Sequence, residues 1–291
     1  MDFYNGFKDI IKTIIPKDIL LFRRKILSNK RLQPRTKLYF EVHLTEHCNL
    51  ACKGCSHFSP IAEKEYLNIS GFEMDCERLS RLSDRQIHGV ALLGGEPLLH
   101  PQIVDVIKII GKLFDYEFIN ILTNGTLLLK QTEEFWELCC KNRVSIHVSW
   151  YPINIDINAI KAKAEEHNVK IYCPHERTNT MRKDVLDIQG EQDIEDNFKL
   201  CFKSNACIQL QNGRLYPCSV VPNIRHFNKY FNCDLKVTKD DYINIYEAKD
   251  TAEIACFLSK PIPFCKYCNI KGSILNGMEW EISKRSITEW T

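Results

Sequence analysis

The stretch that decides the fold is Leu38-Tyr-Phe-Glu-Val-His-Leu44, followed shortly by Cys48-Asn-Leu-Ala-Cys52-Lys-Gly-Cys55. The first part is an apolar run that predicts a buried strand, and the second places three cysteines in the loop beyond it. Three thiolates are one ligand fewer than an iron–sulfur cluster or a closed structural zinc site takes. The sequence therefore predicts a metal centre with one open position, which favours chemistry over simple stabilisation.

Apolar strand-like runs alternate with helical patterns along most of the chain. The predicted strands cover residues 38–44, 87–93, 117–123, 144–150 and 169–173. The helices between them are predicted at 71–83, 101–114, 131–142 and 156–168, with Ser70 as N-cap of the first and Pro101 opening the second. Apolar strands separated by helices indicate an α/β fold with a parallel sheet. The pattern predicts five βα units, and no sixth strand can be identified in the polar stretch 175–200.

Polar and glycine-rich residues follow the predicted strands at the points where each one ends. Gly94-Gly95-Glu96-Pro97 follows the second strand and Thr123-Asn124-Gly125-Thr126 the third, while the fourth ends at Ser149. Active-site residues of parallel α/β barrels lie at the carboxyl ends of the strands. We therefore expect these side chains to surround the three cysteines.

Length, charge and cysteine content limit the class of protein. The 291 residues suffice for one large domain, or for a core of about 200 residues with a small appendage. With 39 Lys and Arg against 37 Asp and Glu, the net charge of +2 gives no field that would attract nucleic acid or an acidic membrane. The 14 cysteines without a signal peptide indicate a reducing cytoplasm, and no apolar run is long enough to span a bilayer.

Residues 1–37 are expected to form a helical extension that precedes the main fold. Two short amphipathic patterns lie at 7–15 and 17–26 and are followed by basic residues. Such a face either packs on the outside of the main domain or lies on a membrane surface. Packing is the interpretation that we favour.

A second group of cysteines appears after residue 200. Gln209 to Cys218 predicts a hairpin with an Asn-Gly turn that places Cys218 just beyond its second strand. Cys265 and Cys268 form a C-x2-C pair, which is typical of a redox pair or of half a zinc site. A second metal site is the natural hypothesis for this part of the chain.

The spacing C-x3-C-x2-C after a strand, together with GGEP after the next one, resembles the radical S-adenosylmethionine (SAM) superfamily. The resemblance implies a partial (β/α)6 TIM-like barrel in which the three cysteines hold a [4Fe-4S] cluster whose open iron binds SAM. It further implies that SAM contacts Gly94, Gly95, Glu96, Asn124 and Ser149. Gly54 departs from the aromatic residue common at that position, so the adenine contact is expected from Phe58 or His57.

The second cysteine group resembles the shortened SPASM domain called Twitch, which carries one auxiliary [4Fe-4S] cluster. Eleven residues separate Cys201 from Gly213, which fits the pattern of that domain, whereas only five separate Cys207 from it. A zinc ribbon that uses the same thiolates is the alternative. The resemblance implies a radical SAM core at 38–195 and a small β-hairpin and helix iron–sulfur domain at 196–291. The implied ligands are Cys201, Cys218, Cys265 and Cys268.

The resemblance implies an oxidoreductase that reductively cleaves SAM to a 5′-deoxyadenosyl radical and abstracts hydrogen from its substrate. A sugar, aminocyclitol or sugar nucleotide is the expected substrate, and a flavodoxin or ferredoxin type protein is the expected reductant. The alternatives are a peptide-modifying maturase and a metal-stabilised binding protein without catalysis. An oxidation of a carbinol carbon needs a nearby base. The candidates for that base by location are His175, Glu176, Arg177 and Arg182.

Overall fold

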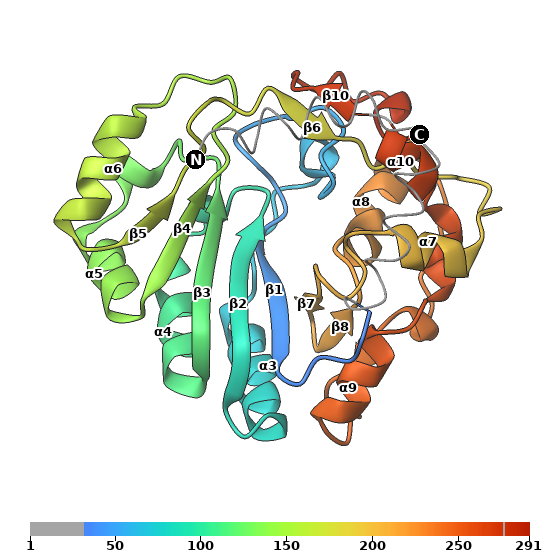
Figure 1. Ribbon diagram of the computed structural model, residues 1–291, viewed down its shortest axis with the longest axis horizontal. Helices are drawn as coiled ribbons and strands as arrows, with labels where there is room; N and C mark the ends of the chain where they lie inside the picture. The colour runs from blue at the N-terminus through green and yellow to red at the C-terminus, as the bar shows by residue number, and fades with distance from the viewer. Residues whose placement is uncertain (1–31, 276) are drawn as a thin grey trace.

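A computed structural model describes residues 32–275 and 277–291, so the two amphipathic patterns predicted at 7–26 lie outside the described residues. The centre of the fold is an eight-stranded sheet in the order β5-β4-β3-β2-β1-β7-β8-β9 (Figure 1). All five predicted strands are present and pair in parallel. They are β1 (Leu38–Thr45), β2 (Gln86–Gly94), β3 (Asp115–Thr123), β4 (Val144–Val148) and β5 (Lys170–Tyr172).

The four predicted helices connect these strands, and in Figure 1 α3 and α4 lie behind the sheet while α5 and α6 lie at its left edge. The first begins two residues earlier than predicted, because the side chain of Asn68, and not Ser70, accepts a hydrogen bond from Gly71 N at 2.8 Å. Pro101 lies in the turn before the second helix. The helices are α3 (Ile69–Leu82), α4 (Ile103–Leu113), α5 (Glu133–Lys141) and α6 (Ile157–Glu166).

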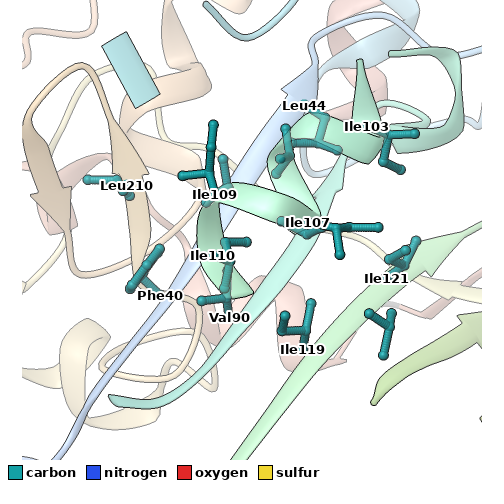
Figure 2. Packing of buried hydrophobic residues seen from close by; sticks show 14 of the residues in the cluster. Phe40, Leu44, Val90, Ile103, Ile107, Ile109, Ile110, Ile119, Ile121 and Leu210 are labelled. Atoms are coloured by element: carbon teal, nitrogen blue, oxygen red, sulfur yellow. The ribbon is translucent and has the colours of Figure 1, made fainter. Parts of the chain in front are cut away.

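The main hydrophobic core lies between the sheet and these helices (Figure 2). Alternate residues of β1, Phe40 and Leu44 among them, face the helices and are fully buried. Ile107 and Ile110 of α4 pack against them, because their spacing puts both on one face of the helix. Full burial of each such side chain stabilises the fold by about 1.5–3 kcal/mol. The other β1 residues, including Glu41 and His43, face the opposite side of the sheet, where the site lies.

The predicted hairpin is present, but it belongs to the main sheet. Asn212 (φ 49°) and Gly213 (φ 73°) both have positive φ, as a type I′ turn requires. The first hairpin strand pairs in parallel with β1 on the edge away from β2. The sixth parallel strand therefore lies beside β1 and far from β5. The domain boundary predicted at residue 195 thus separates two segments that contribute strands to one sheet. The added strands are β7 (Gln209–Gln211), β8 (Arg214–Tyr216) and β9 (Ile243–Asn244).

A second core forms on the C-terminal side around α8 (Val220–Phe231), where Phe227 and Trp290 are fully buried. A two-stranded sheet of β6 (Thr180–Arg182) and β10 (Gly277–Glu279) lies above and to the right of the carboxyl end of β1 in Figure 1. The remaining α-helices are α7 (Ile194–Leu200), α9 (Thr251–Leu258) and α10 (Ile270–Leu275). The 3-10 helices are η1 (Ser59–Ile61), η2 (Pro97–Leu99), η3 (Leu128–Lys130), η4 (Lys239–Asp241), η5 (Pro263–Tyr267) and η6 (Ile287–Glu289). Within the described ranges, every helix is too short or too polar to cross a bilayer.

Candidate active site

A pocket lies at the carboxyl ends of β1 to β4, where the loops after these strands meet. It brings together residues that lie about 100 positions apart in the sequence. Seven of the residues predicted for the cluster and for SAM line it, namely Cys48, Cys52, Cys55, Gly94, Gly95, Asn124 and Ser149. Parallel strands that end at one edge of a sheet produce this arrangement.

Gly94 and Gly95 are required by the backbone that passes beside them. A Cβ at Gly94 would lie 2.3 Å from Thr45 O, and one at Gly95 would lie 2.0 Å from His47 O. Gly95 N also donates to Thr45 O at 2.7 Å. The glycine pair therefore lets the end of β2 lie directly against the start of the cysteine loop, which adds a structural reason to its predicted contact with SAM.

We expect Gly95→Ala to displace the cysteine loop, because the added Cβ overlaps backbone atoms that cannot rotate away. Overpacking of this kind destabilises a fold by about 1–3 kcal/mol. The melting temperature and the iron bound after anaerobic reconstitution should both fall. Gly71→Ala is the matched control, since its Cβ would lie 3.4 Å from Asn68 Oδ1, which is an ordinary contact. Equal iron binding by both variants would contradict the argument.

Glu96 occupies a different position from the one predicted for it. Its carboxylate accepts hydrogen bonds from Thr123 Oγ1 at 2.6 Å, Asn124 N at 2.8 Å and Leu98 N at 3.1 Å. Burial raises the pKa of Glu96, and these donors oppose that shift. The side chain is 1% exposed and does not line the pocket. Its visible role is to tie the loop after β2 to the loop after β3, so that Asn124 is held beside the cysteines.

The side chain of Asn124 lies next to the cysteine loop. Its Nδ2 donates to Asn49 Oδ1 at 2.8 Å and lies 3.7 Å from Cys48 Sγ. Its Oδ1 accepts from Thr126 N at 3.0 Å, which fixes the orientation of the amide. Asn124 therefore connects the loop after β3 to the first cysteine.

The structure contradicts the expectation for Phe58 and favours its neighbour. Phe58 is buried in the second core, with its ring 5.9 Å from those of Phe227 and Trp290. His57 lines the pocket instead, and its Nδ1 donates to Gly94 O at 2.9 Å. Burial lowers the pKa of His57 to about 3, so the imidazole is neutral with its proton on Nδ1.

The departure at Gly54 has a cause in the C-terminal segment. Gly54 has φ +59°, and a Cβ there would lie 2.7 Å from Met278 Cε and 2.9 Å from Glu289 O. A large aromatic side chain is therefore excluded at this position. Tyr151 and Met181, which the sequence analysis did not single out, line the pocket instead.

The cysteine loop has features that fit a cationic cluster. Burial raises the pKa of Cys48 to about 12 and that of Cys52 to about 11, so without a nearby positive charge these thiols stay protonated. N–H donors already face both sulfurs, from Leu50 N to Cys48 at 3.3 Å and from Trp280 Nε1 to Cys52 at 3.2 Å. Bound metal deprotonates such thiols, and N–H donors support the thiolates. In the described part of the chain, no three Cys, His, Asp or Glu side chains form a ready site for a single ion.

The four cysteines predicted for the auxiliary cluster lie within electrostatic reach of one another. Cys201 affects the pKa of each of the other three, Cys218, Cys265 and Cys268. Cys207 lies beside them, and its thiol donates to the carboxylate of Glu41. Cys201 acts on all three of these thiols, whereas Cys207 interacts with Cys201 and Cys218, so Cys201 is the better candidate for the fourth ligand.

Local structure holds the auxiliary cysteines in place. Asn197 Nδ2 donates to the carbonyl oxygens of Cys265, at 2.8 Å, and Cys268. At the start of α8, the amides of Val220 and Val221 donate to the sulfur of Cys218, which favours its thiolate. Burial raises the pKa of Cys218 to about 11 against these bonds.

The four candidates for a base, His175, Glu176, Arg177 and Arg182, lie on the surface. All four are exposed, and none of them lines the pocket. The guanidinium of Arg182 packs over the ring of Phe202 at 3.8 Å, and that of Arg177 lies 5.9 Å from the ring of Trp150. The structure gives no support to these residues as a base for the pocket.

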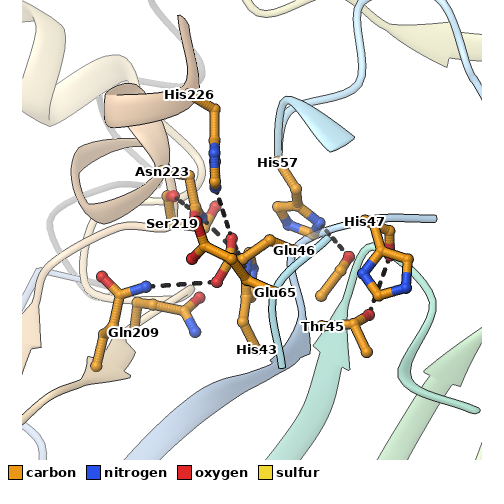
Figure 3. Close-up of polar contacts among 12 residues, drawn as sticks. His43, Thr45, Glu46, His47, His57, Glu65, Gln209, Ser219, Asn223 and His226 are labelled. Carbon is orange, nitrogen blue, oxygen red and sulfur yellow. Dashed lines mark hydrogen bonds and ion pairs between the residues drawn. The ribbon is translucent and has the colours of Figure 1, made fainter. Parts of the chain in front are cut away.

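A buried polar network that the sequence analysis missed lies between β1 and α8 (Figure 3). Glu46 Oε2 lies 2.9 Å from His226 Nε2 and 3.5 Å from His43 Nδ1. Burial alone would raise the pKa of Glu46, but the two histidines hold it well below its usual range. The ring centroids of His43 and His57 are 4.6 Å apart, so the network reaches the pocket wall. The position of His43 on the inner face of β1 was the only signal in the sequence.

Comparisons with known proteins agree with this geometry. The profile of the radical SAM superfamily matches residues 42–156. A GTP 3′,8-cyclase of Alkaliphilus oremlandii is 31% identical over 119 residues, which are 41% of this chain and 37% of that relative. A GTP 3′,8-cyclase of Clostridium botulinum strain Okra is 24% identical over 248 residues, 79% of this chain and 76% of the relative. The chain thus spans only about a third of the length of the relatives to which it is more than 30% identical.

The likeness in fold extends further along the chain. A crystal structure of BtrN in complex with AdoMet and 2-DOIA aligns with a TM-score of 0.51 at 14% identity, over 81% of this chain and 94% of BtrN. At that identity the comparison speaks for the fold alone. The match at residues 42–156 contains the three cysteines and Gly94 to Pro97. These residues meet in one pocket at the carboxyl edge of the sheet, and the segment that contains them, residues 42–156, matches the radical SAM superfamily.

Proposed function

We propose that this chain cleaves SAM reductively and abstracts a hydrogen atom from a sugar, an aminocyclitol or a sugar nucleotide. The observation that carries the proposal is the pocket, in which Cys48, Cys52 and Cys55 face Gly94, Asn124 and Ser149. The bound cluster and SAM would supply an electron and a 5′-deoxyadenosyl radical. The protein's own residues would orient SAM and the substrate C–H bond.

The chemistry of the pocket wall supports a sugar or an aminocyclitol, which both carry many hydroxyl groups. Its polar side chains beyond the cysteines are hydroxyl, amide, phenol and imidazole groups, and His57 is neutral. None of the described residues that line it is Lys or Arg. Hydroxyl and amide groups exchange hydrogen bonds with a polyol in both directions.

A nucleotide substrate is the second candidate, because both relatives described above are named GTP 3′,8-cyclase. A triphosphate is normally bound by Arg or Lys side chains, and the pocket wall offers none among its described residues. A polyol is therefore the better match for this pocket.

The second cysteine group supports an auxiliary [4Fe-4S] cluster, which would serve as an electron acceptor or a substrate ligand. Cys201, Cys218, Cys265 and Cys268 would hold it, with Asn197 supporting two of them through their carbonyl oxygens. A flavodoxin or ferredoxin type protein would deliver the electron to the first cluster.

Anaerobic reconstitution followed by iron and sulfide analysis tests the cofactors. We expect about eight iron and eight sulfide per chain, because two [4Fe-4S] clusters contain that number. With dithionite, SAM should give methionine and 5′-deoxyadenosine. Bound zinc without iron, or SAM left intact by the iron-loaded protein, would contradict the proposal.

Deuterium transfer identifies the substrate class. Deuterated aminocyclitols and sugars, GTP and candidate peptides are each incubated with the reduced protein and SAM. We expect deuterium in 5′-deoxyadenosine with a polyol only. Transfer from GTP would instead identify a nucleotide as the substrate. Transfer from a peptide would identify the protein as a peptide-modifying maturase.

A further inference from the structure

The C-terminal segment 277–291 covers the cysteine loop. Lys53 N donates to Glu281 O at 2.9 Å, and Ser283 N donates to Ala51 O at 2.7 Å. These bonds lie on either side of an antiparallel bridge between Cys52 and Ile282. The segment is therefore held in one register along the loop that contains the second cysteine.

Trp280 projects from this segment toward the sulfur of Cys52. Its Nε1 donates to Cys52 Sγ at 3.2 Å. Its ring stacks on Tyr151 with 6.0 Å between centroids and 20° between planes, and its backbone N donates to Asn179 O at 2.8 Å. The backbone and the ring are both anchored, so the direction of the N–H bond is determined by packing.

Trp290, in the same segment, provides a comparison. Its Nε1 also donates to the cysteine loop, at 2.9 Å, but the acceptor is the carbonyl oxygen of Cys55. The chain contains four tryptophans, and among the described contacts Trp280 alone donates to a cysteine sulfur. A buried indole N–H needs a hydrogen-bond acceptor, and this need explains the bond from Trp290 to a carbonyl oxygen. A thiol sulfur is a weak acceptor, and it becomes a good one when it is a thiolate.

We propose that Trp280 is a positioning residue for the SAM-binding cluster, whose reduction potential it raises through its hydrogen bond to the Cys52 sulfur. This inference rests on the proposed function of Cys48, Cys52 and Cys55. Reduction adds one electron from the external reductant and makes the cluster more negative. An N–H that donates to a coordinating sulfur stabilises that added charge, so reduction becomes easier.

The first test compares Trp280→Phe with Trp290→Phe after anaerobic reconstitution. Phe at position 280 keeps an aromatic ring against Tyr151 and removes the donor. The cluster is identified by an EPR signal that changes when SAM is added. We expect its midpoint potential, measured without SAM, to be more negative in Trp280→Phe than in the wild type and to be unchanged in Trp290→Phe. Equal potentials in all three proteins, or equal shifts in both variants, would overturn the proposal.

The second test uses the wild-type protein and does not depend on the folding of a variant. The protein is labelled with ¹⁵N at the indole nitrogen of tryptophan, reduced, and examined by pulsed EPR. We expect one ¹⁵N coupling to the SAM-sensitive cluster, because one indole N–H contacts one of its sulfurs. A loaded cluster without this coupling would show that the hydrogen bond is absent. Failure of the wild type to bind iron would instead refute the proposed function.

Discussion

Cys52→Ala should leave about four iron per chain and no detectable 5′-deoxyadenosine from SAM. The variant removes one of the three thiolates proposed to hold a cluster with an open position, and two thiolates would be too few to retain it. The backbone bridge between Cys52 and Ile282 does not involve the side chain, so the protein should still fold. Iron analysis, far-UV circular dichroism and chromatography of the SAM products check each part of this expectation.

Cys140→Ala is the matched control for this experiment. Cys140 is a half-buried free thiol near the end of α5, and it does not line the pocket. Its variant should bind about eight iron and cleave SAM as the wild type does. Normal SAM cleavage by Cys52→Ala would remove Cys52 from the assigned ligands, and loss of iron from both variants would point to general destabilisation.

The double variant Cys265→Ser/Cys268→Ser should separate the two metal sites. We expect iron to fall to about four per chain, and SAM cleavage to continue while turnover of the substrate is lost. Two ligands are removed together because the two thiolates that remain would be too few to retain a cluster. Iron content, 5′-deoxyadenosine and oxidised product are measured on the same sample.

Cys256→Ser controls for the loss of a thiol in the C-terminal part of the chain. Cys256 is exposed on α9, and both iron and turnover should stay at the wild-type level in its variant. If the double variant kept eight iron, the auxiliary assignment would be wrong. If the wild type contained about four iron and one zinc, the zinc ribbon would be the correct interpretation of the second group.

Local patterns were sufficient to predict the central part of the fold. The runs that became β1 to β4 are apolar and five to nine residues long, and their positions were confirmed. β7 is only three residues long and pairs with β1, about 170 residues earlier in the chain, so no local pattern indicates it. The start of α3 differed by two residues because Asn68 and Ser70 are both good N-caps, and only the structure shows which one accepts the bond.

In the site, too, local sequence patterns predicted some residues, whereas contacts between distant parts of the chain could not be predicted. Each cysteine and glycine predicted for the pocket lies at the end of a strand or in the loop that follows it, so its place followed from the strand assignments. The choice between His57 and Phe58 depended on the left-handed conformation of Phe58, which a sequence does not reveal. Glu46 and His226 meet across 180 residues, and no spacing rule connects them.

The cover over the cysteine loop also has a consequence for biosynthesis. Cys52 and Trp280 lie 228 residues apart, so the ribosome completes the loop long before residues 277–291 exist. During that interval the loop has neither the backbone pairing at Ile282 nor the indole against its sulfur. We therefore expect the loop to be most accessible to iron and sulfide on the nascent chain.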